Sequence, residues 1–459
     1  MVLGGPISLA VFPLDPIDRA NRNDLYEIGI ADSLIQQLSS AKGIGVRPLS
    51  ATRKYSEIER DLSSAGRELK VDYLLVSNYQ IANGRIKVTA QLFAVATSTF
   101  EEKFSVEKDA SNLFSAQDAI AESIGKWLLS RFGMESAGFQ PSHGTTNEEA
   151  YGLYLQAMNL SEERGVQNLR KALEYLDRAV ALDPKYALAW ASKAHLHRDI
   201  VGHTDANQTE HYEKSMEAIR KALALDPNLS DAYSALCFNK SRYEYDFDGA
   251  ETECKRALEL DPNSAVAHKT YANFLYTRGR FDESIVEIKK AMELQPVSYR
   301  NQQIYGLALY FAGRFSDAED QFKRLVELNP NHTYIYGRLV KILEEQGKEP
   351  EAFEYLIKML TIQGESAKAQ RFTSAYRTGG WRSVVLEQIR AAEGGDDPRN
   401  FQLACWNAKI GNKDKALDYL EKAYRERSFQ MPIVKIEPQL VSLRDDPRFV
   451  DLVRRVEGK

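Results

Sequence analysis

The chain contains few cysteines and no long hydrophobic run. Only Cys237, Cys254 and Cys405 occur among 459 residues, which is too few for a disulfide framework. Cys237 and Cys254 lie inside repeated helical segments, so we expect both to be buried free thiols. No run of 18 or more apolar residues is present, and we therefore expect no membrane-spanning helix within this chain.

An excess of charge of either sign is also missing. The net charge is −5, with 15 basic and 16 acidic side chains in residues 1–132 and 45 and 49 in the remainder. Proteins that hold the phosphate backbone of nucleic acids need clustered positive charge. We therefore expect no nucleic-acid binding by this region alone. With 43% hydrophobic and 27% charged residues, the composition is typical of a soluble globular protein.

Recognisable catalytic motifs are absent. We find no phosphate-binding loop, His-Glu-x-x-His, Cys-x-x-Cys or nucleophile elbow. The best metal candidates are His195, His197, His203 and His211. His195 and His197 are two residues apart on an expected helix, so they point to different sides, and packed or solvated histidines are the better interpretation. We predict that the chain is not an enzyme and has no catalytic residue, metal or cofactor.

A recurring Leu-x-Pro phrase is the clearest feature that the sequence does contain. Proline ends a helix because it lacks an N–H and clashes with the preceding turn. Successive prolines of the phrase are separated by 43, 35, 34 and 34 residues, and a period of 34 is typical of helix–turn–helix units in a solenoid. The prolines are Pro184, Pro227, Pro262, Pro296 and Pro330.

Small residues recur in phase with these prolines. In the unit 299–332, Gly306 and Ala318 occupy places eight and twenty, where two helices can approach closely, and Gly313 takes the turn between them. The preceding unit has Ala272, Ser284 and Gly279 at the same places.

This pattern resembles the tetratricopeptide repeat, which implies an all-α solenoid with a concave groove for a protein or peptide ligand. We assign the solenoid to residues 151–430, with about seven recognisable units and one degenerate unit at 367–396. The unit 187–229 has nine extra residues and the unit 230–264 has one. A terminal cap, which solenoids need, is expected at 431–459.

The first 132 residues follow a different pattern. Short apolar runs at 7–14, 44–49 and 71–81 and an alternating run from Ile86 to Leu92 predict strands. Asn83-Gly84 is a strong hairpin signal. With the intervening helical segments, this order predicts an α/β domain with a mixed sheet over 1–132. Residues 133–150 are rich in Gly, Ser, Thr and Pro and are expected to form a linker.

The concave wall of the solenoid should be lined by places two, five, six, nine and twelve of each first helix. Cations beside aromatic rings on this wall favour an acidic or carboxylate-bearing peptide; the alternative is a solvated wall whose charges balance acidic neighbours. The predicted groove residues are Lys269, Asn273, Tyr276, Arg300, Tyr334, Arg338 and Lys341, with His195 and Phe238 on the same wall.

Part of this set is similar to the carboxylate-clamp version of the repeat. Lys269, Asn273 and Arg338 match the clamp, whereas Ile304 and Tyr334 stand where the clamp has asparagine and lysine.

The phrases "SLAVFPLDP", "IGVRPLSATRKY" and "LRDDPRFVDLVRR" resemble a TolB amino-terminal-like domain joined to tetratricopeptide repeats. That pairing is similar to the C-terminal region of CadC/ToxR-like membrane-tethered transcriptional regulators. The resemblance implies a winged helix and a membrane helix upstream, and a periplasmic sensory region that binds a protein or peptide. Similar tails follow adenylate cyclases and serine/threonine kinases, which would be cytoplasmic. A regulatory tail of that kind and a free-standing repeat scaffold are the alternatives.

Overall fold

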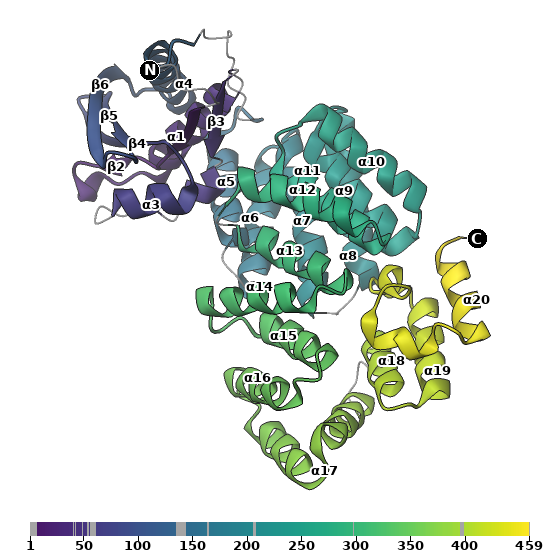
Figure 1. The fold of residues 1–459 in the computed structure, drawn as a ribbon. Helices are drawn as coiled ribbons and strands as arrows, with labels where there is room; N and C mark the ends of the chain where they lie inside the picture. The colour runs from purple at the N-terminus through teal and green to yellow at the C-terminus, as the bar shows by residue number, and fades with distance from the viewer. Residues whose placement is uncertain are drawn as a thin grey trace. The chain divides into compact units, whose positions relative to one another are not determined.

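The computed structural model describes residues 7–458 except 40, 42, 48, 53–54, 56–60, 135–143, 163–164, 205–207, 297 and 395–398. Its contacts divide the chain into two compact units, which are treated separately below (Figure 1). The first comprises Met1–Glu163, Gln167–Trp190 and Ala291–Ser298, and the second Arg164–Val166, Ala191–Lys290 and Tyr299–Lys459.

A mixed sheet organises the amino-terminal domain. Its strand order is β3-β1-β4-β5-β6, with β2 paired to β4. The pairs of β1 with β3 and β4 are parallel, and those of β5 with β4 and β6 are antiparallel. The predicted fold class is confirmed. The strands are β1 (Ile7–Val11), β2 (Asp15–Pro16), β3 (Ile44–Arg47), β4 (Tyr73–Ala82), β5 (Arg85–Ala94) and β6 (Thr99–Asp109).

Alternation along the strands sends side chains to two helical layers. Leu9 and Val11 of β1 pack with α1 (Asp24–Ser39) and α4 (Leu113–Arg131), whereas Ala10 packs on the other face with α2 (Leu49–Thr52) and α3 (Leu62–Leu69). The hairpin predicted at Asn83-Gly84 is present, with φ values of 52° and 72°, the positive values that this turn requires. One of the intervening helical segments is α3, which begins at Leu62, and residues 56–60 lie outside the described part.

Helices joined by short turns make up the repeat region. Two repeat-region helices, α5 (Glu148–Glu162) and α6 (Val166–Leu182), precede α7. The following helices are α7 (Ala187–Thr204), α8 (Gln208–Leu225), α9 (Ser230–Asn239), α10 (Phe247–Leu260), α11 (Ala265–Thr277), α12 (Phe281–Leu294), α13 (Tyr299–Phe311), α14 (Phe315–Leu328), α15 (Thr333–Glu345), α16 (Glu349–Ile362), α17 (Ser366–Glu393), α18 (Asn400–Lys409), α19 (Lys413–Arg425) and α20 (Pro447–Val456). No helix in the described ranges combines the length and apolarity needed to cross a bilayer.

The small residues of the repeat lie where helices cross. A β-carbon placed on Gly306 would come within 2.7 Å of the Phe322 ring, and Ala318 is fully buried. The turn residue Gly313 has φ +74°, a conformation that favours glycine. The degenerate unit is also a helix pair, because α17 kinks at Gly379-Gly380, where the backbone leaves helical geometry. These observations agree with the 34-residue register.

We predict that Gly306→Leu and Ala318→Leu each lower the free energy of unfolding by roughly 1–3 kcal/mol, because extra side-chain volume forces the crossing helices apart. Neighbouring repeats support one another, so the loss should broaden or shift the whole helical transition. Thermal unfolding followed by circular dichroism measures this. A melting curve identical to that of the wild type for both variants would contradict the assigned register.

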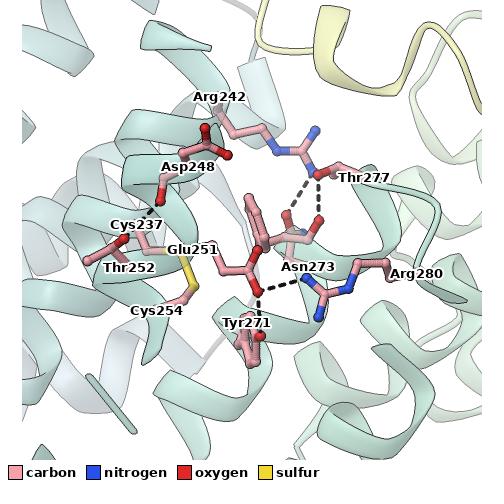
Figure 2. Close-up of a disulfide and its surroundings, with 11 residues drawn as sticks. Cys237, Arg242, Asp248, Glu251, Thr252, Cys254, Tyr271, Asn273, Thr277 and Arg280 are labelled. Atoms are coloured by element: carbon pink, nitrogen blue, oxygen red, sulfur yellow. Dashed lines mark hydrogen bonds and ion pairs between the residues drawn. A yellow bond between two sulfur atoms is a disulfide. The ribbon is translucent and has the colours of Figure 1, made fainter. Parts of the chain in front are cut away.

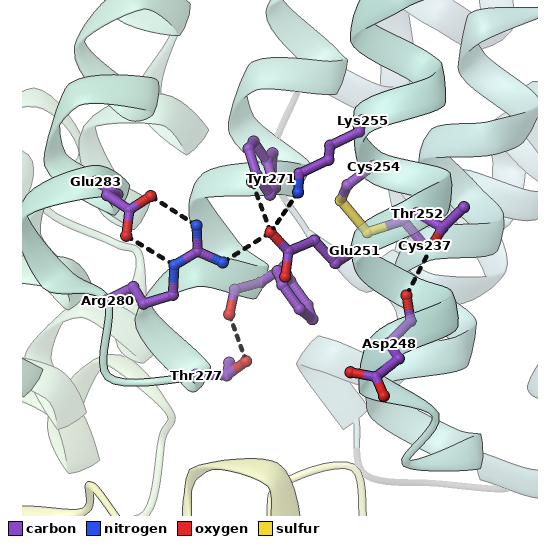
Figure 3. A network of polar contacts seen from close by, with 11 residues as sticks. Cys237, Asp248, Glu251, Thr252, Cys254, Lys255, Tyr271, Thr277, Arg280 and Glu283 are labelled. Atoms are coloured by element: carbon purple, nitrogen blue, oxygen red, sulfur yellow. Dashed lines mark hydrogen bonds and ion pairs between the residues drawn. A yellow bond between two sulfur atoms is a disulfide. The ribbon is translucent and has the colours of Figure 1, made fainter.

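A carboxylate on α10 ties one repeat to the next. Glu251 accepts hydrogen bonds from Arg280 at 2.8 Å and Tyr271 at 3.1 Å, and pairs with Lys255 at 3.0 Å (Figure 3). Arg280, in the turn after α11, also pairs with Glu283. Burial raises the pKa of Glu251, but Arg280 and the other donors outweigh this effect and lower the pKa to about 2.

The same bridge recurs two periods further along. Glu319 of α14 accepts hydrogen bonds from Lys323 at 2.6 Å, Lys348 at 2.7 Å and Gln346 at 2.7 Å. Burial raises the pKa of Glu319, but these donors lower it to about 2. A carboxylate at this place of the repeat therefore fastens the following helix pair.

We predict that the hydrogen bonds and ion pairs of Glu319 make the free energy of unfolding depend on pH in the acidic range. Because the pKa of Glu319 is lowered in the folded state, its contribution is complete above the ordinary value of 4.5 and is lost as the pH falls towards 2. Glu319→Gln should lower the free energy of unfolding by roughly 1–3 kcal/mol at pH 7 and by much less near pH 2. Urea unfolding at several pH values measures the difference, and an equal loss at pH 7 and pH 2 would contradict it.

The cysteines differ from the sequence-based expectation. Cys237 on α9 and Cys254 on α10 form a disulfide, with their Cα atoms 5.2 Å apart (Figure 2). The expectation of two free thiols is wrong, because antiparallel packing of the two helices brings together side chains 17 residues apart in sequence. Cys405 is free and buried.

We predict that the free energy of unfolding of the double variant Cys237→Ala/Cys254→Ala is about 3 kcal/mol lower than that of the wild type, since the disulfide closes a short loop and so restricts the unfolded chain. Dithiothreitol should lower the melting temperature of the wild type and leave that of the double variant unchanged. Equal sensitivity of both proteins to the reductant would contradict this role of the Cys237–Cys254 disulfide.

Candidate functional site

The second unit contains a pocket of about 160 Å³. The first helices of successive repeats form most of its wall, and the segment after α19 forms the rest. The lining residues are Arg198, Asp199, Phe238, Arg242, Lys269, Thr270, Asn273, Tyr276, Arg300, Gln303, Ile304, Leu307, Phe311, Tyr334, Arg338, Phe429, Gln430 and Ile433.

Six of the seven groove residues predicted from the sequence meet at this pocket. They come from α11, α13 and α15, three successive first helices. Lys341 is not among the lining residues. Phe238 also lines the pocket, whereas His195 does not. That these residues bind a ligand stays a prediction. The six are Lys269, Asn273, Tyr276, Arg300, Tyr334 and Arg338.

Positive charge predominates among the described lining residues, five of which are basic and one acidic. The acidic residue, Asp199, accepts a hydrogen bond from Arg198 at 2.8 Å and forms an ion pair with Arg300. Burial raises the pKa of Asp199, but Arg198 and Arg300 bring it far below its usual value. Asp199 is therefore a carboxylate that offsets one of the two neighbouring charges.

Arg242 is a buried cation whose hydrogen-bond acceptors are all neutral. Its side chain is 5% exposed. Its Nη2 donates to Asn273 Oδ1 at 2.7 Å (Figure 2). The same Nη2 donates to the Tyr276 hydroxyl at 3.1 Å. Within the described residues its buried Nε has no acceptor. Burying a charge without a counter-charge is costly, so this guanidinium is a ready partner for an anion.

Arg338 is another lining cation with a neutral hydrogen-bond acceptor. Its Nε donates to the Tyr334 hydroxyl at 2.8 Å, and its guanidinium carbon lies 4.8 Å from the centre of the Tyr334 ring. Burial lowers the pKa of Arg338, but Tyr334 and the more distant Glu437 raise it above its usual value. The side chain therefore stays charged beside an aromatic face.

A π-helical turn places Arg242 in the pocket. Lys240–Glu244 forms this turn directly after α9. A π-turn takes up one more residue than an α-helical turn and is frequent at functional sites. The unit 230–264 is the one that carries a single extra residue. The insertion is thus absorbed at the position that carries Arg242.

The chain's own C-terminal segment crosses the concave face here. Within this segment, residues 428–433, the Phe429 carbonyl accepts from Arg242 at 3.5 Å, and the Ser428 carbonyl accepts from the Tyr245 hydroxyl at 3.0 Å. Phe429, Gln430 and Ile433 then line the pocket. The chain's own C-terminal segment therefore forms part of the wall of the predicted groove at this point.

Sequence reasoning missed several of these residues. Arg198 and Gln303 occupy places twelve and five of their units, so the rule that found Lys269 could also have found them. Arg242 falls outside the rule because the inserted residue shifts the register. The contribution of the C-terminal segment has no local sequence signal, since its partners lie nearly 190 residues earlier.

The candidate histidines do not converge on one point. Nδ1 of His197 lies 2.9 Å from Nδ1 of His211, while Nε2 of His195 contacts the backbone carbonyl of Asp231 at 3.0 Å. The side chain of His203 is outside the described part. Within the described residues, no group of three or more potential metal ligands is found.

Comparison with protein families finds two kinds of match along the chain. Residues 6–123 match the second domain of HilA/YgeH-like transcriptional regulators. Residues 206–229, 242–302 and 306–367 match tetratricopeptide-repeat models. The chain joins a regulator-like domain to tetratricopeptide repeats. The regulator and repeat parts of the sequence-based resemblance are thus supported, and the finer TolB-like and CadC/ToxR-like assignments stay predictions.

One curated relative is 25% identical over 185 residues, the protein named "Putative adenylate cyclase 3" of Rhizobium meliloti (strain 1021). The match covers 40% of this chain and only 32% of that protein. The chain therefore spans about a third of that relative's length.

Solved structures of repeat proteins resemble parts of the chain. PilF of Pseudomonas aeruginosa is 21% identical, with a TM-score of 0.32, over 52% of this chain and 91% of its own. A thermophilic tetratricopeptide-repeat protein of Thermus thermophilus is 16% identical, with a TM-score of 0.34, over 42% and 98%. Human IFIT1 is 18% identical, with a TM-score of 0.41, over 68% and 80%.

Proposed function

We propose that this chain is the noncatalytic sensory and protein-interaction region of a bacterial membrane-tethered transcriptional regulator. The regulator-like domain at residues 6–123 and the repeats that follow it support this proposal. The CadC/ToxR-like organisation, with a winged helix and a membrane helix upstream, is part of it. The proposal also includes the absence of catalysis, of a cofactor and of nucleic-acid binding by this region alone.

The observation that carries the proposed binding role is the convergence of basic groove residues on one pocket. Lys269, Arg300 and Arg338 come from three successive repeats, and Tyr276 and Tyr334 stand beside them. Charge-assisted hydrogen bonds are stronger than neutral ones. The partner in the proposal is a protein or peptide that presents an acidic side chain or a carboxylate.

A periplasmic location belongs to the same proposal. The Cys237–Cys254 disulfide supports it, because disulfides persist in oxidising compartments and are rare in the cytosol of most bacteria.

A regulatory tail of an adenylate cyclase is the second candidate function. The similarity to the Rhizobium meliloti protein favours it. The two candidates differ in their expected redox state, since a cytoplasmic tail would carry Cys237 and Cys254 as thiols. Alkylation of the full-length protein in intact cells, followed by mass spectrometry, separates them.

We predict that the double variant Lys269→Ala/Arg338→Ala weakens binding of an acidic peptide by about 2–4 kcal/mol, because two charged donors are removed from the centre of the site. A peptide-array screen with wild-type protein, followed by fluorescence anisotropy of the hits, measures the loss. The matched control is Lys289→Ala/Arg324→Ala, which removes two exposed cations from the second helices α12 and α14. Hits that bind both double variants as tightly as the wild type would refute the groove assignment.

A further inference from the structure

We infer that the pocket takes a compact organic carboxylate that carries an aromatic or aliphatic group, presented by a free small acid or by the end of a peptide. This inference rests on the proposed binding role of the same face and names the chemistry of its ligand. It starts from the charges. Arg242 and Arg338 have only neutral hydrogen-bond acceptors within the described residues, and Asp199 is the one acidic residue among five basic ones that line the pocket, so a bound anion would add to a counter-charge that is incomplete.

The guanidinium groups are arranged to present N–H groups to such an anion. The guanidinium carbons of Arg198 and Arg242 lie 5.3 Å and 5.8 Å from the centre of the Phe238 ring. A guanidinium held against an aromatic ring keeps its charge and its geometry, and its planar donors match a carboxylate. Arg242 retains a buried Nε–H that has no acceptor among the described residues.

Apolar side chains on part of the wall would contact the remainder of the ligand. Ile304, Leu307, Phe311 and Ile433 line the pocket beside the arginines. An engineered apolar cavity of about 150 Å³ holds benzene, and the volume here is about 160 Å³. A carboxylate joined to one ring or one short aliphatic chain therefore matches both the size and the polarity.

The segment 428–433 limits how the ligand can enter. Its Phe429 and Gln430 line the pocket together with residues of the repeat helices, and the Phe429 carbonyl accepts a hydrogen bond from Arg242. A ligand in the pocket has to fit beside this segment. A compact acid, or the carboxylate end of a peptide, needs less room there than an extended peptide.

The test is calorimetry and thermal shift on the full chain with four probes and two matched neutral compounds. The probes are benzoate, hexanoate, inorganic phosphate and a hexapeptide with a free C-terminus; benzamide and the amidated hexapeptide are the neutral counterparts. We expect benzoate or hexanoate, or the free-ended peptide, to bind and raise the melting temperature. The neutral counterparts should bind at least about tenfold more weakly, since they lack the charge-assisted hydrogen bonds. The probe that binds identifies the source of the carboxylate.

Arg242→Gln should weaken the bound acid at least about tenfold. Lys269→Met serves as a second variant in case the first does not fold, and exposed Lys289→Met as the control that keeps wild-type affinity. Failure of every acid to bind, equal binding of benzoate and benzamide, or phosphate binding as tightly as the organic acids would overturn the inference. If no small acid or free peptide end binds, but acidic peptides still bind in a way that depends on Lys269 and Arg338, then the proposed function stands and only this inference fails.

Discussion

The structure depends on the close approach of two helices at small residues, repeated every 34 residues. A single helix pair cannot bury its apolar face, and stacking the pairs gives each one the neighbour that it needs. Gly306 shows how tight the crossing is, since even one added carbon would meet the Phe322 ring. The ion bridges of Glu251 and Glu319 then fasten each pair to the next at equivalent places. Because the period is kept, the first helices all present one face, and basic residues from successive repeats can meet.

The departure from the period is as informative as the period itself. One extra residue in the unit 230–264 is accommodated as a π-helical turn, and that turn carries Arg242 into the pocket. The disulfide between Cys237 and Cys254 joins the helices on either side of the turn. The π-helical turn is thus held between two helices that the disulfide joins. Such turns are frequent at functional sites.

The same charges that suit the pocket for an anion lower the stability of the protein without a ligand. Cations in a partly dry site without full counter-charge are costly, and Asp199 can offset only part of the charge of Arg198 and Arg300. Aromatic rings beside the guanidinium groups and neutral acceptors such as Asn273 and Tyr276 reduce this cost. An anionic ligand would remove the rest, so binding and stabilisation should accompany each other.

The sequence by itself determined the architecture and most of the candidate site. Hydrophobic alternation and the Asn83-Gly84 turn are local signals, as is the spacing of the prolines, and each specifies its element without help from distant residues. The groove positions followed from the same period, and six of the seven predicted residues line one pocket. Only the tertiary structure decided three features: the pairing of Cys237 with Cys254, the position of Arg242 in the pocket, and the contribution of residues 428–433 to the pocket wall. These features depend on which segments pack side by side across 17 to nearly 190 residues of chain, and no local pattern encodes that proximity.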